Sequence, residues 1–167
     1  MIAGRNSAGN FLATSMSNSP LVLAEFLPYR LSVLANRISR ELSRLYADRF
    51  DLGITQWRVL AVLGLHPGIS ADEVCRHTEL DKVAVSRAVQ HLRDKKLVSR
   101  RLDTADRRKS VLKLTSRGQS TYQRIVPQAR RYEQQLRANL AAGIRQDLDA
   151  CLSALDRATQ RDLVSKS

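Results

Sequence analysis

The chain has 167 residues, of which 28 are Lys or Arg and 16 are Asp or Glu, so its formal net charge at neutral pH is +12. This length suits one ordinary domain with a hydrophobic core, or a small domain joined to an oligomerisation element. No stretch approaches the roughly 20 apolar residues of a membrane-spanning helix, and the N-terminus lacks the pattern of a secretory signal. We therefore expect a cytoplasmic protein, and the positive charge favours nucleic acid as its partner.

The N-terminal third predicts a tail followed by two helices. Residues 1–25 are rich in Ser, Asn, Gly and Ala and have little periodicity, which indicates a flexible N-terminal tail. Residues 26–53 repeat apolar side chains at helical spacing and end at a glycine, so we expect one helix there. Its apolar stripe contains Leu27, Leu31, Leu34, Ile38, Leu42 and Leu45. A second helix is expected from an N-cap at Thr55 to about Leu65.

The next segment predicts a helix-turn-helix. Ser70 and Glu73 form a capping box that opens a third helix, and Asp81 is a suitable N-cap for a fourth. One face of the fourth helix carries Val85, Ala88, Val89 and Leu92, and the opposite face carries Val83, Ser86, Arg87, Gln90 and His91. Guanidinium, amide and hydroxyl groups match base edges and phosphates in a DNA major groove. The second face therefore indicates a recognition helix.

A β-hairpin with a basic tip is predicted after this helix. Residues 97–102 and 109–115 have strand patterns, and the second alternates apolar and polar side chains from Ser110 onward. The turn between them carries Arg107 and Arg108, and an arginine at such a tip suits the narrow minor groove. The expected fold class is therefore mainly α (α+β), a winged helix-turn-helix with a two-stranded wing.

Two further helices complete the chain. Thr115 can cap a long helix to about Ala142, which Pro127 should kink or split, and a final helix carries Cys151. The apolar faces of the first helix and of these two have no partner in the winged module, so a second copy of the chain would cover them. We expect a homodimer whose recognition helices lie about 34 Å apart on a palindromic operator. A monomeric helical bundle is the alternative.

These patterns divide the chain into four segments. They are a flexible tail (1–25), an N-terminal dimerisation helix (26–53), a winged helix-turn-helix DNA-binding domain (54–115) and C-terminal dimerisation helices (116–167).

The chain resembles the MarR family of bacterial transcriptional regulators. The resemblance rests on residues 81–89 followed by Lys96-Leu97-Val98, then on Asp106-Arg107-Arg108 and residues 112–118, which match the family's D-x-R…L-T-x-x-G signature. It extends from about Phe26 to Leu163. Lys96 departs from the pattern, since the family often has Gly before Leu-Val, and the feature that this difference affects is the end of the recognition helix. The resemblance implies an obligate dimer that binds double-stranded DNA.

The candidate DNA-binding residues are Lys82, Val83, Ser86, Arg87, Gln90, Asp106, Arg107, Arg108 and Lys109. Ser86, Arg87 and Gln90 suit base edges and nearby phosphates, Val83 suits a thymine methyl group, and Lys82 suits a phosphate. The resemblance assigns Arg108 to the minor groove, with Asp106 orienting it through a charge-assisted hydrogen bond, and Arg107 and Lys109 to the backbone. The alternative for the two adjacent arginines is a solvated turn.

The resemblance also implies a small-molecule effector, often an aromatic acid, bound between the dimerisation helices and the winged module. Candidate ligand-binding residues are Tyr29, Trp57, Arg58 and His66, which combine aromatic rings with groups that can meet a carboxylate. The alternative is that Trp57 is a packing residue. The expected function is a transcriptional regulator, a repressor released by its effector, although activation remains open.

Other classes of function fit the sequence less well. There is no G-x-S-x-G motif, phosphate-binding glycine loop or paired Cys/His motif, so we expect neither an enzyme, nor a metal site, nor a cofactor. A metal site at Cys75 and His77 is disfavoured because neighbours two positions apart point to different helix faces. Two alternatives remain: a redox-responsive regulator that senses oxidants through Cys75, and a dimeric interaction protein of the same fold without specific DNA binding.

Overall fold

The structure is a computed structural model that describes residues 20–102 and 110–164, with side chains up to residue 160. The predicted tail up to residue 19 and the wing-tip candidates Asp106, Arg107, Arg108 and Lys109 lie outside the described residues. The chain forms two compact units, Met1–Asn36 and Arg37–Ser167. In the described residues no helix is long and apolar enough to cross a membrane.

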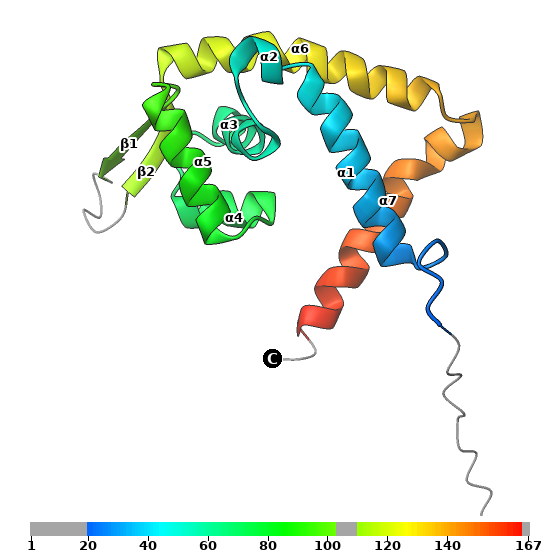
Figure 1. The fold of residues 1–167 in the computed structure, drawn as a ribbon. Coiled ribbons are helices and arrows are strands. Elements are labelled where there is room, and N and C mark those ends of the chain that lie inside the picture. Colours follow the sequence, from blue (N-terminus) through cyan, green and yellow to red (C-terminus); the bar gives the residue numbers. More distant parts are fainter. Residues whose placement is uncertain (1–19, 103–109, 165–167) are drawn as a thin grey trace, which may run out of the picture. The chain divides into compact units, whose positions relative to one another are not determined.

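The described residues form seven helices and one two-stranded antiparallel sheet, which confirms the predicted fold class (Figure 1). The helices are α1 (Leu27–Arg44), α2 (Ala47–Phe50), α3 (Ile54–Leu65), α4 (Ala71–Thr78), α5 (Lys82–Asp94), α6 (Ser116–Ala138) and α7 (Ala142–Val164). The strands are β1 (Val98–Leu102) and β2 (Ser110–Leu114).

The single helix predicted over residues 26–53 is wrong, because the helix breaks after Arg44. The amides of Leu45 and Tyr46 bond to carbonyls three residues back, and the chain then restarts as α2. The break turns Tyr46 into the core, where only 1% of it is exposed, and this burial offsets the lost helical hydrogen bonds. Asp51, at φ 51°, ends α2 in the left-handed conformation.

Two helix boundaries also differ from the prediction. The N-cap of α3 is Gly53 rather than Thr55, which lies inside the first turn. The long α6 ends at Ala138, before the predicted Ala142, and it runs through Pro127 without splitting. The predicted N-caps at Ser70, Asp81 and Thr115 are all confirmed by hydrogen bonds from the helix amides to their side chains.

The core lies between α3, α5 and the base of the wing. It contains Val59, Leu60 and Leu63 of α3, the predicted apolar stripe of α5, Leu97 just before β1, and Leu112 of β2. In the sheet Arg100 pairs with Leu112, and Ile69 from the α3–α4 connection bridges to the other side of Leu112. The wing is thus fastened to the helix-turn-helix by main-chain hydrogen bonds as well as by side chains.

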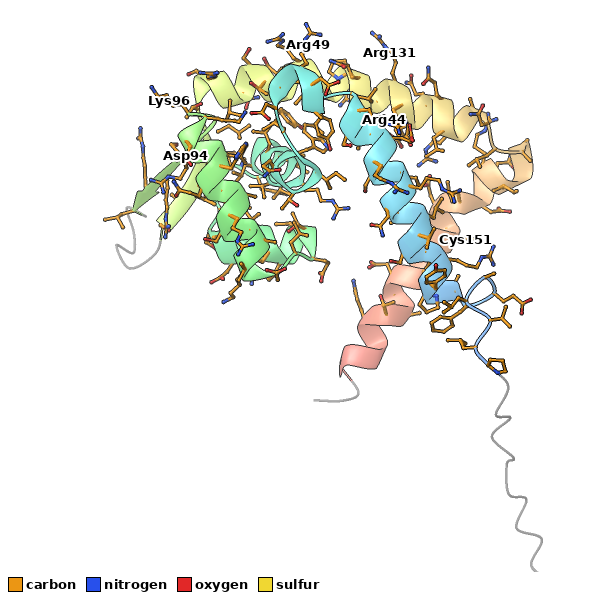
Figure 2. All side chains as sticks on the ribbon, viewed as in Figure 1. Arg44, Arg49, Asp94, Lys96, Arg131 and Cys151 are labelled. Carbon is orange, nitrogen blue, oxygen red and sulfur yellow. The ribbon has the colours of Figure 1, made fainter. Side chains whose placement is uncertain are left out.

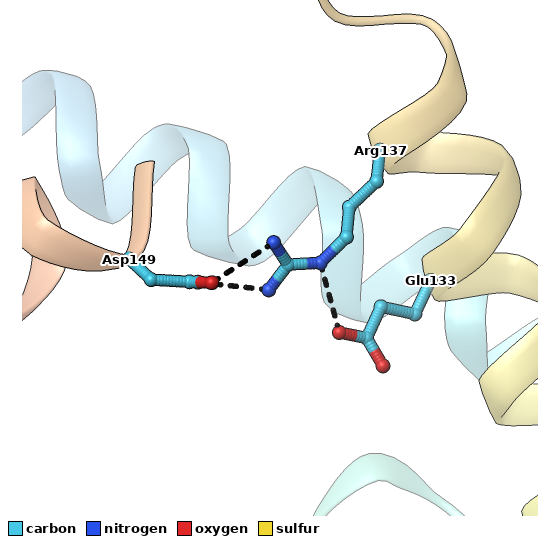
Figure 3. A network of polar contacts seen from close by, with 3 residues as sticks. All are labelled: Glu133, Arg137 and Asp149. Carbon is cyan, nitrogen blue, oxygen red and sulfur yellow. Dashed lines mark hydrogen bonds and ion pairs between the residues drawn. The ribbon is translucent and has the colours of Figure 1, made fainter. Parts of the chain in front are cut away.

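Arg137 of α6 joins this helix to α7 (Figure 3). It donates to Asp149 of α7 through Nη2 at 2.8 Å and Nη1 at 3.3 Å, and to Glu133 of its own helix through Nε at 3.1 Å. The hydrogen bond from Arg137 holds the pKa of the Asp149 carboxyl below its ordinary value. A bidentate arginine with a second acceptor has fewer free rotamers than a single surface pair, so it fixes the α6–α7 turn more firmly.

Candidate nucleic-acid interface

Helix α5 presents an exposed polar face opposite its buried stripe. The side chain of Asp81 accepts a hydrogen bond from the Ala84 amide at 2.8 Å and so starts the helix. Lys82, Val83, Ser86, Arg87 and Gln90 are all exposed. Val83 is an apolar side chain with 59% exposure, so it is free to contact a partner. All the α5 candidates predicted from the sequence therefore share one accessible surface.

Some of these side chains already have local partners. Lys82 Nζ lies 3.1 Å from Asp72 Oδ1 of α4, but both side chains are largely exposed, so the pair contributes little and a phosphate can replace it. Gln90 Nε2 donates to Asp94 Oδ1 at 2.8 Å and Gln90 Oε1 accepts from Arg93 Nη1 at 3.3 Å. To bind a base, Gln90 must exchange these two bonds.

Arg93 belongs to the same surface and was not among the sequence candidates. It lines a cavity of about 200 Å³ between α4, α5 and the sheet, together with Lys82, Ser86, Gln90 and Arg100. Arg100 is held there by its Nε donating to Ser110 Oγ at 2.8 Å. The spacing contained the signal for Arg93, because it lies three positions after Gln90 and seven after Ser86 and hence on the same helix face.

The wing joins α6 at a tight junction around the Leu97 carbonyl. That oxygen accepts from the Thr115 amide at 3.0 Å, while Thr115 Oγ1 donates to the Lys96 carbonyl at 2.7 Å and accepts from the Gly118 amide at 3.0 Å. A Cβ built on Gly118 would lie 2.0 Å from Leu97 O. Thr115 and Gly118 of the signature therefore hold the wing in place.

Lys96 ends the recognition helix in a left-handed conformation, at φ 59°. The Lys96 amide bonds to the Arg93 carbonyl and the Leu97 amide to the Leu92 carbonyl, each at 2.8 Å. This is the Schellman pattern, and Leu92 and Leu97 supply its hydrophobic contact because both are buried. The family often has Gly at this position, and Lys96 adopts here the left-handed conformation that glycine favours.

The candidate ligand-binding residues fall into different surroundings. Trp57 is buried between Tyr46 and Tyr122, with ring centroids at 5.5 and 6.3 Å. Arg58 is exposed and donates to Ser39 Oγ at 3.3 Å. His66 follows the last turn of α3 and its ring stacks on that of His77, with centroids 4.4 Å apart. It lies nine positions after Trp57, which corresponds to about 13 Å of helix. Tyr29 belongs to the other compact unit and is exposed.

The two cysteines are free thiols in separate helices. Cys75 of α4 is partly buried against the core and also lines the cavity that contains Arg93 and Arg100, while Cys151 of α7 is exposed. In the described residues, no three His, Cys, Asp or Glu side chains are grouped as a metal ion would need.

The helix-turn-helix, its exposed polar helix and the two-stranded wing define a winged helix-turn-helix protein. Residues 50–109 match the family model of the MarR family. Solved structures agree over most of the chain as well, and these matches confirm the predicted resemblance to MarR-family winged-helix proteins. The family consists of DNA-binding transcriptional regulators rather than enzymes. No curated protein matches the sequence.

Three solved structures illustrate the similarity. A MarR/EmrR family regulator from Acinetobacter is 28% identical, with a TM-score of 0.73 over 80% of this chain and 94% of that one. BpsR of Bordetella bronchiseptica, whose DNA binding is regulated by 6-hydroxynicotinic acid, is 25% identical, with a TM-score of 0.72 over 83% and 98%. MepR of Staphylococcus aureus, in complex with DNA, shares the fold at 20% identity, with a TM-score of 0.72 over 80% and 98%.

Proposed function

We propose that this protein is a sequence-specific transcriptional repressor that binds a palindromic operator as a homodimer. The observation that carries the proposal is the exposed face of α5, where cationic, amide, hydroxyl and small apolar side chains stand together on a capped helix. Arg87 and Gln90 would read base edges with Ser86, Val83 would contact a thymine methyl group, and Lys82 would bind a phosphate. Arg93 and Arg100 would add backbone contacts beside them.

The wing supplies the second set of contacts in this proposal. Arg108 would enter the minor groove, oriented by Asp106, and Arg107 and Lys109 would bind the backbone on either side. The described residues support this proposal at the hairpin base, which hydrogen bonds join to α5 and to the start of α6.

The dimer is proposed from apolar surface that the single chain leaves exposed. Leu136 of α6, with Ile144 and Leu152 of α7, is exposed by 38%, 58% and 51%. Ile38, Leu42 and Leu136 also line an apolar groove of about 330 Å³. Single exposed leucines are ordinary, but several exposed apolar side chains together with an apolar groove suit an interface. Segments 26–53 and 116–167 would form the dimerisation domain, and 54–115 would bind DNA.

We also propose an aromatic carboxylate as the effector, in line with the ligand that regulates BpsR. Near Trp57, the hydroxyl of buried Tyr46 has no hydrogen-bond partner among the described residues, and such a group is costly unless something binds it. Burial raises the pKa of Tyr46 to about 12, while the positive charge of Arg58 acts in the opposite direction. A neutral phenol and a guanidinium suit a carboxylate, so Tyr46 joins Trp57, Arg58, Tyr29 and His66 as a candidate.

The test of operator binding is a DNA titration at several salt concentrations. One duplex would carry the region upstream of the protein's own coding sequence, and a scrambled duplex of equal length would be the control. Tighter binding to the first that persists at moderate salt supports a specific regulator. Equal binding with a steep salt dependence would indicate phosphate attraction alone and would favour an interaction protein of the same fold.

The effector is tested on the same complex. Aromatic monocarboxylates, with 6-hydroxynicotinic acid as the first probe, should release wild-type protein from the operator, whereas Tyr46→Phe and Arg58→Gln should bind DNA normally and release only at higher concentrations. A reporter assay decides between repression and activation. Deletion of a repressor raises expression of its target gene, whereas deletion of an activator lowers it.

A further inference from the structure

A second basic site lies at the opposite end of the recognition helix. A cavity of about 310 Å³ lies where α2, the C-terminal end of α5 and the first turns of α6 meet. Its lining includes Arg49 and Phe50 of α2, Lys95 at the C-cap of α5, and Arg117, Thr121 and Arg124 of α6. Figure 2 shows Arg49 and Lys96 at this end of the winged module. Four cations from three elements thus surround one small cavity.

Little negative charge offsets these cations. Lys95 is paired with Asp51, and the hydrogen bond from Lys95 lowers the pKa of that carboxyl below its ordinary value. Among the described residues no carboxylate lies within 4.0 Å of the guanidinium groups of Arg49, Arg117 or Arg124. The first turn of α6 also has no acidic residue, so the positive end of that helix adds to the potential. The cavity carries an excess of positive charge that an anion would neutralise.

Two of the arginines are held in place by an aromatic ring. The guanidinium carbons of Arg124 and Arg49 lie 5.0 and 5.7 Å from the centroid of the Phe50 ring, within the range of a cation–π interaction. Arginine loses considerable rotamer freedom when it binds a ligand, and part of that loss has already occurred here. Ser120 and the buried Thr121 add hydroxyl groups at the same wall. These features favour a built site over a loose cluster of surface charges.

The position of the cavity separates it from the proposed DNA surface. Lys95 lies 13 positions after Lys82, which corresponds to about 20 Å along the helix axis. The proposed base-reading side chains Arg87 and Gln90 lie eight and five positions before Lys95, whereas the cavity is lined by Lys95, the C-cap of α5, and by Leu97, which precedes the wing. A volume near 300 Å³ is at the lower end of small-ligand pockets, and it suits a compact anion better than a duplex.

We propose that this cavity binds the phosphoryl group of a small polyanionic metabolite. Arg117 and Arg124 would form charge-assisted hydrogen bonds to its oxygens, with Arg49 and Lys95 completing the positive surround and Thr121 offering a hydroxyl. The bound anion would link the end of the recognition helix to α2 and α6. The site is independent of the proposed effector, which is a monocarboxylate bound near Tyr46.

The first experiment is isothermal titration of the full chain with inorganic pyrophosphate, at constant ionic strength and in a phosphate-free buffer. Saturable binding of one pyrophosphate per chain is expected. Arg117→Gln and Arg124→Gln should each weaken it about tenfold or more, since each removes charged hydrogen bonds. Arg131→Gln is the matched control, because Arg131 is exposed on the same helix, seven positions after Arg124, and does not line the cavity. It should bind like wild type.

Three outcomes would overturn the proposal. One is the absence of saturable binding, and another is an equal loss in all three variants, which would reflect net charge only. The third concerns DNA: if Arg117→Gln lowers DNA affinity well beyond Arg131→Gln while pyrophosphate binding is unchanged, the cations contact the DNA backbone instead. Thermal unfolding without pyrophosphate verifies that each variant is folded. Failure of specific operator binding would leave these outcomes unaffected.

Discussion

Lys96 is a residue whose backbone conformation favours glycine. A non-glycine residue in the left-handed region brings its Cβ close to a carbonyl oxygen, at a cost of roughly 1–2 kcal/mol. The Schellman hydrogen bonds and the contact between Leu92 and Leu97 hold Lys96 there at φ 59°. Glycine would relieve the strain, although it would lose more entropy on folding.

Lys96→Gly should therefore raise the free energy of unfolding by about 1 kcal/mol. Urea denaturation followed by circular dichroism measures this difference. Lys96→Ala is the control, since it removes the same charge but keeps the Cβ, and it should leave stability nearly unchanged. Equal stabilisation by both variants would assign the effect to charge rather than to backbone strain.

Gly118 is a second residue whose backbone surroundings favour glycine, because no space is available for a side chain. Its missing side chain allows α6 to approach Leu97 so closely that a Cβ would lie 2.0 Å from a backbone oxygen. Gly118→Ala should destabilise the protein by about 3 kcal/mol, because the wing junction must move apart. The control is Gly143→Ala in α7, where nothing lies within 4 Å of the added carbon. That change should stabilise slightly, and a similar loss in both variants would contradict the reasoning.

At the scale of elements, the starts of α4, α5 and α6 were predictable because capping is local. Ser70, Asp81 and Thr115 each bond to an amide three residues later, and a pattern of a few residues contains that information. The break after Arg44 was not predictable in this way. It occurs because Tyr46 leaves the helical path to pack on Trp57 of another helix, and this contact forms only in the folded chain. Local rules therefore located the DNA-binding elements and missed a junction set by tertiary packing.

Two residues of the recognition helix are expected to contribute to DNA binding in different ways. Arg87→Ala should cost roughly 1–3 kcal/mol of operator affinity and relax discrimination at one base position, whereas Lys82→Ala should weaken all sequences about equally. Titrations against the operator and single-base variants measure both effects. The ion pair of Lys82 with Asp72 is exposed, so its loss should not disturb the fold. A uniform loss in both variants would refute the assignment of Arg87 to base reading.

The capping box of α4 predicts a dependence on pH. Hydrogen bonds from the Ser70 amide, and then from its hydroxyl, hold the pKa of Glu73 below its ordinary value of 4.5. Because the pKa is lower in the folded chain, Glu73 stabilises the fold above pH 4.5 and this contribution is lost as the pH falls through the folded pKa. The unfolding temperature should decline more steeply below that pH in wild type than in Glu73→Gln, which keeps the acceptor oxygen. Parallel curves would contradict this prediction.

At the scale of the whole molecule, the sequence predicted the class of partner but only part of the interface. Net charge and the pattern of α5 indicated DNA, and five candidate residues share one exposed face. Tyr46 was missed as a ligand candidate because its importance lies in an unpaired hydroxyl, which composition and spacing do not reveal. The cavity around Arg117 and Arg124 was missed because it combines three elements, each unremarkable in its own sequence pattern.

The proposed dimer makes a prediction at this scale. Leu152→Glu should shift the protein from dimer to monomer in sedimentation equilibrium and lower operator affinity, because a buried charge would oppose the apolar interface. Gln146→Glu is the matched control, since it adds the same charge at another exposed position of α7. A dimer that persists in Leu152→Glu would exclude this part of α7 from the interface.

The junction of Thr115 and Gly118 has a consequence for how such proteins diverge. These two positions are constrained by the carbonyls of Lys96 and Leu97, which belong to the protein's own backbone. Arg87 and Gln90 lie on an exposed face, where Gln90 bonds only to exposed side chains of its own helix. A duplicated gene can therefore exchange its base-reading residues one by one while the wing junction stays fixed. Two chains that share the signature would therefore have the same wing junction and could still bind different operators.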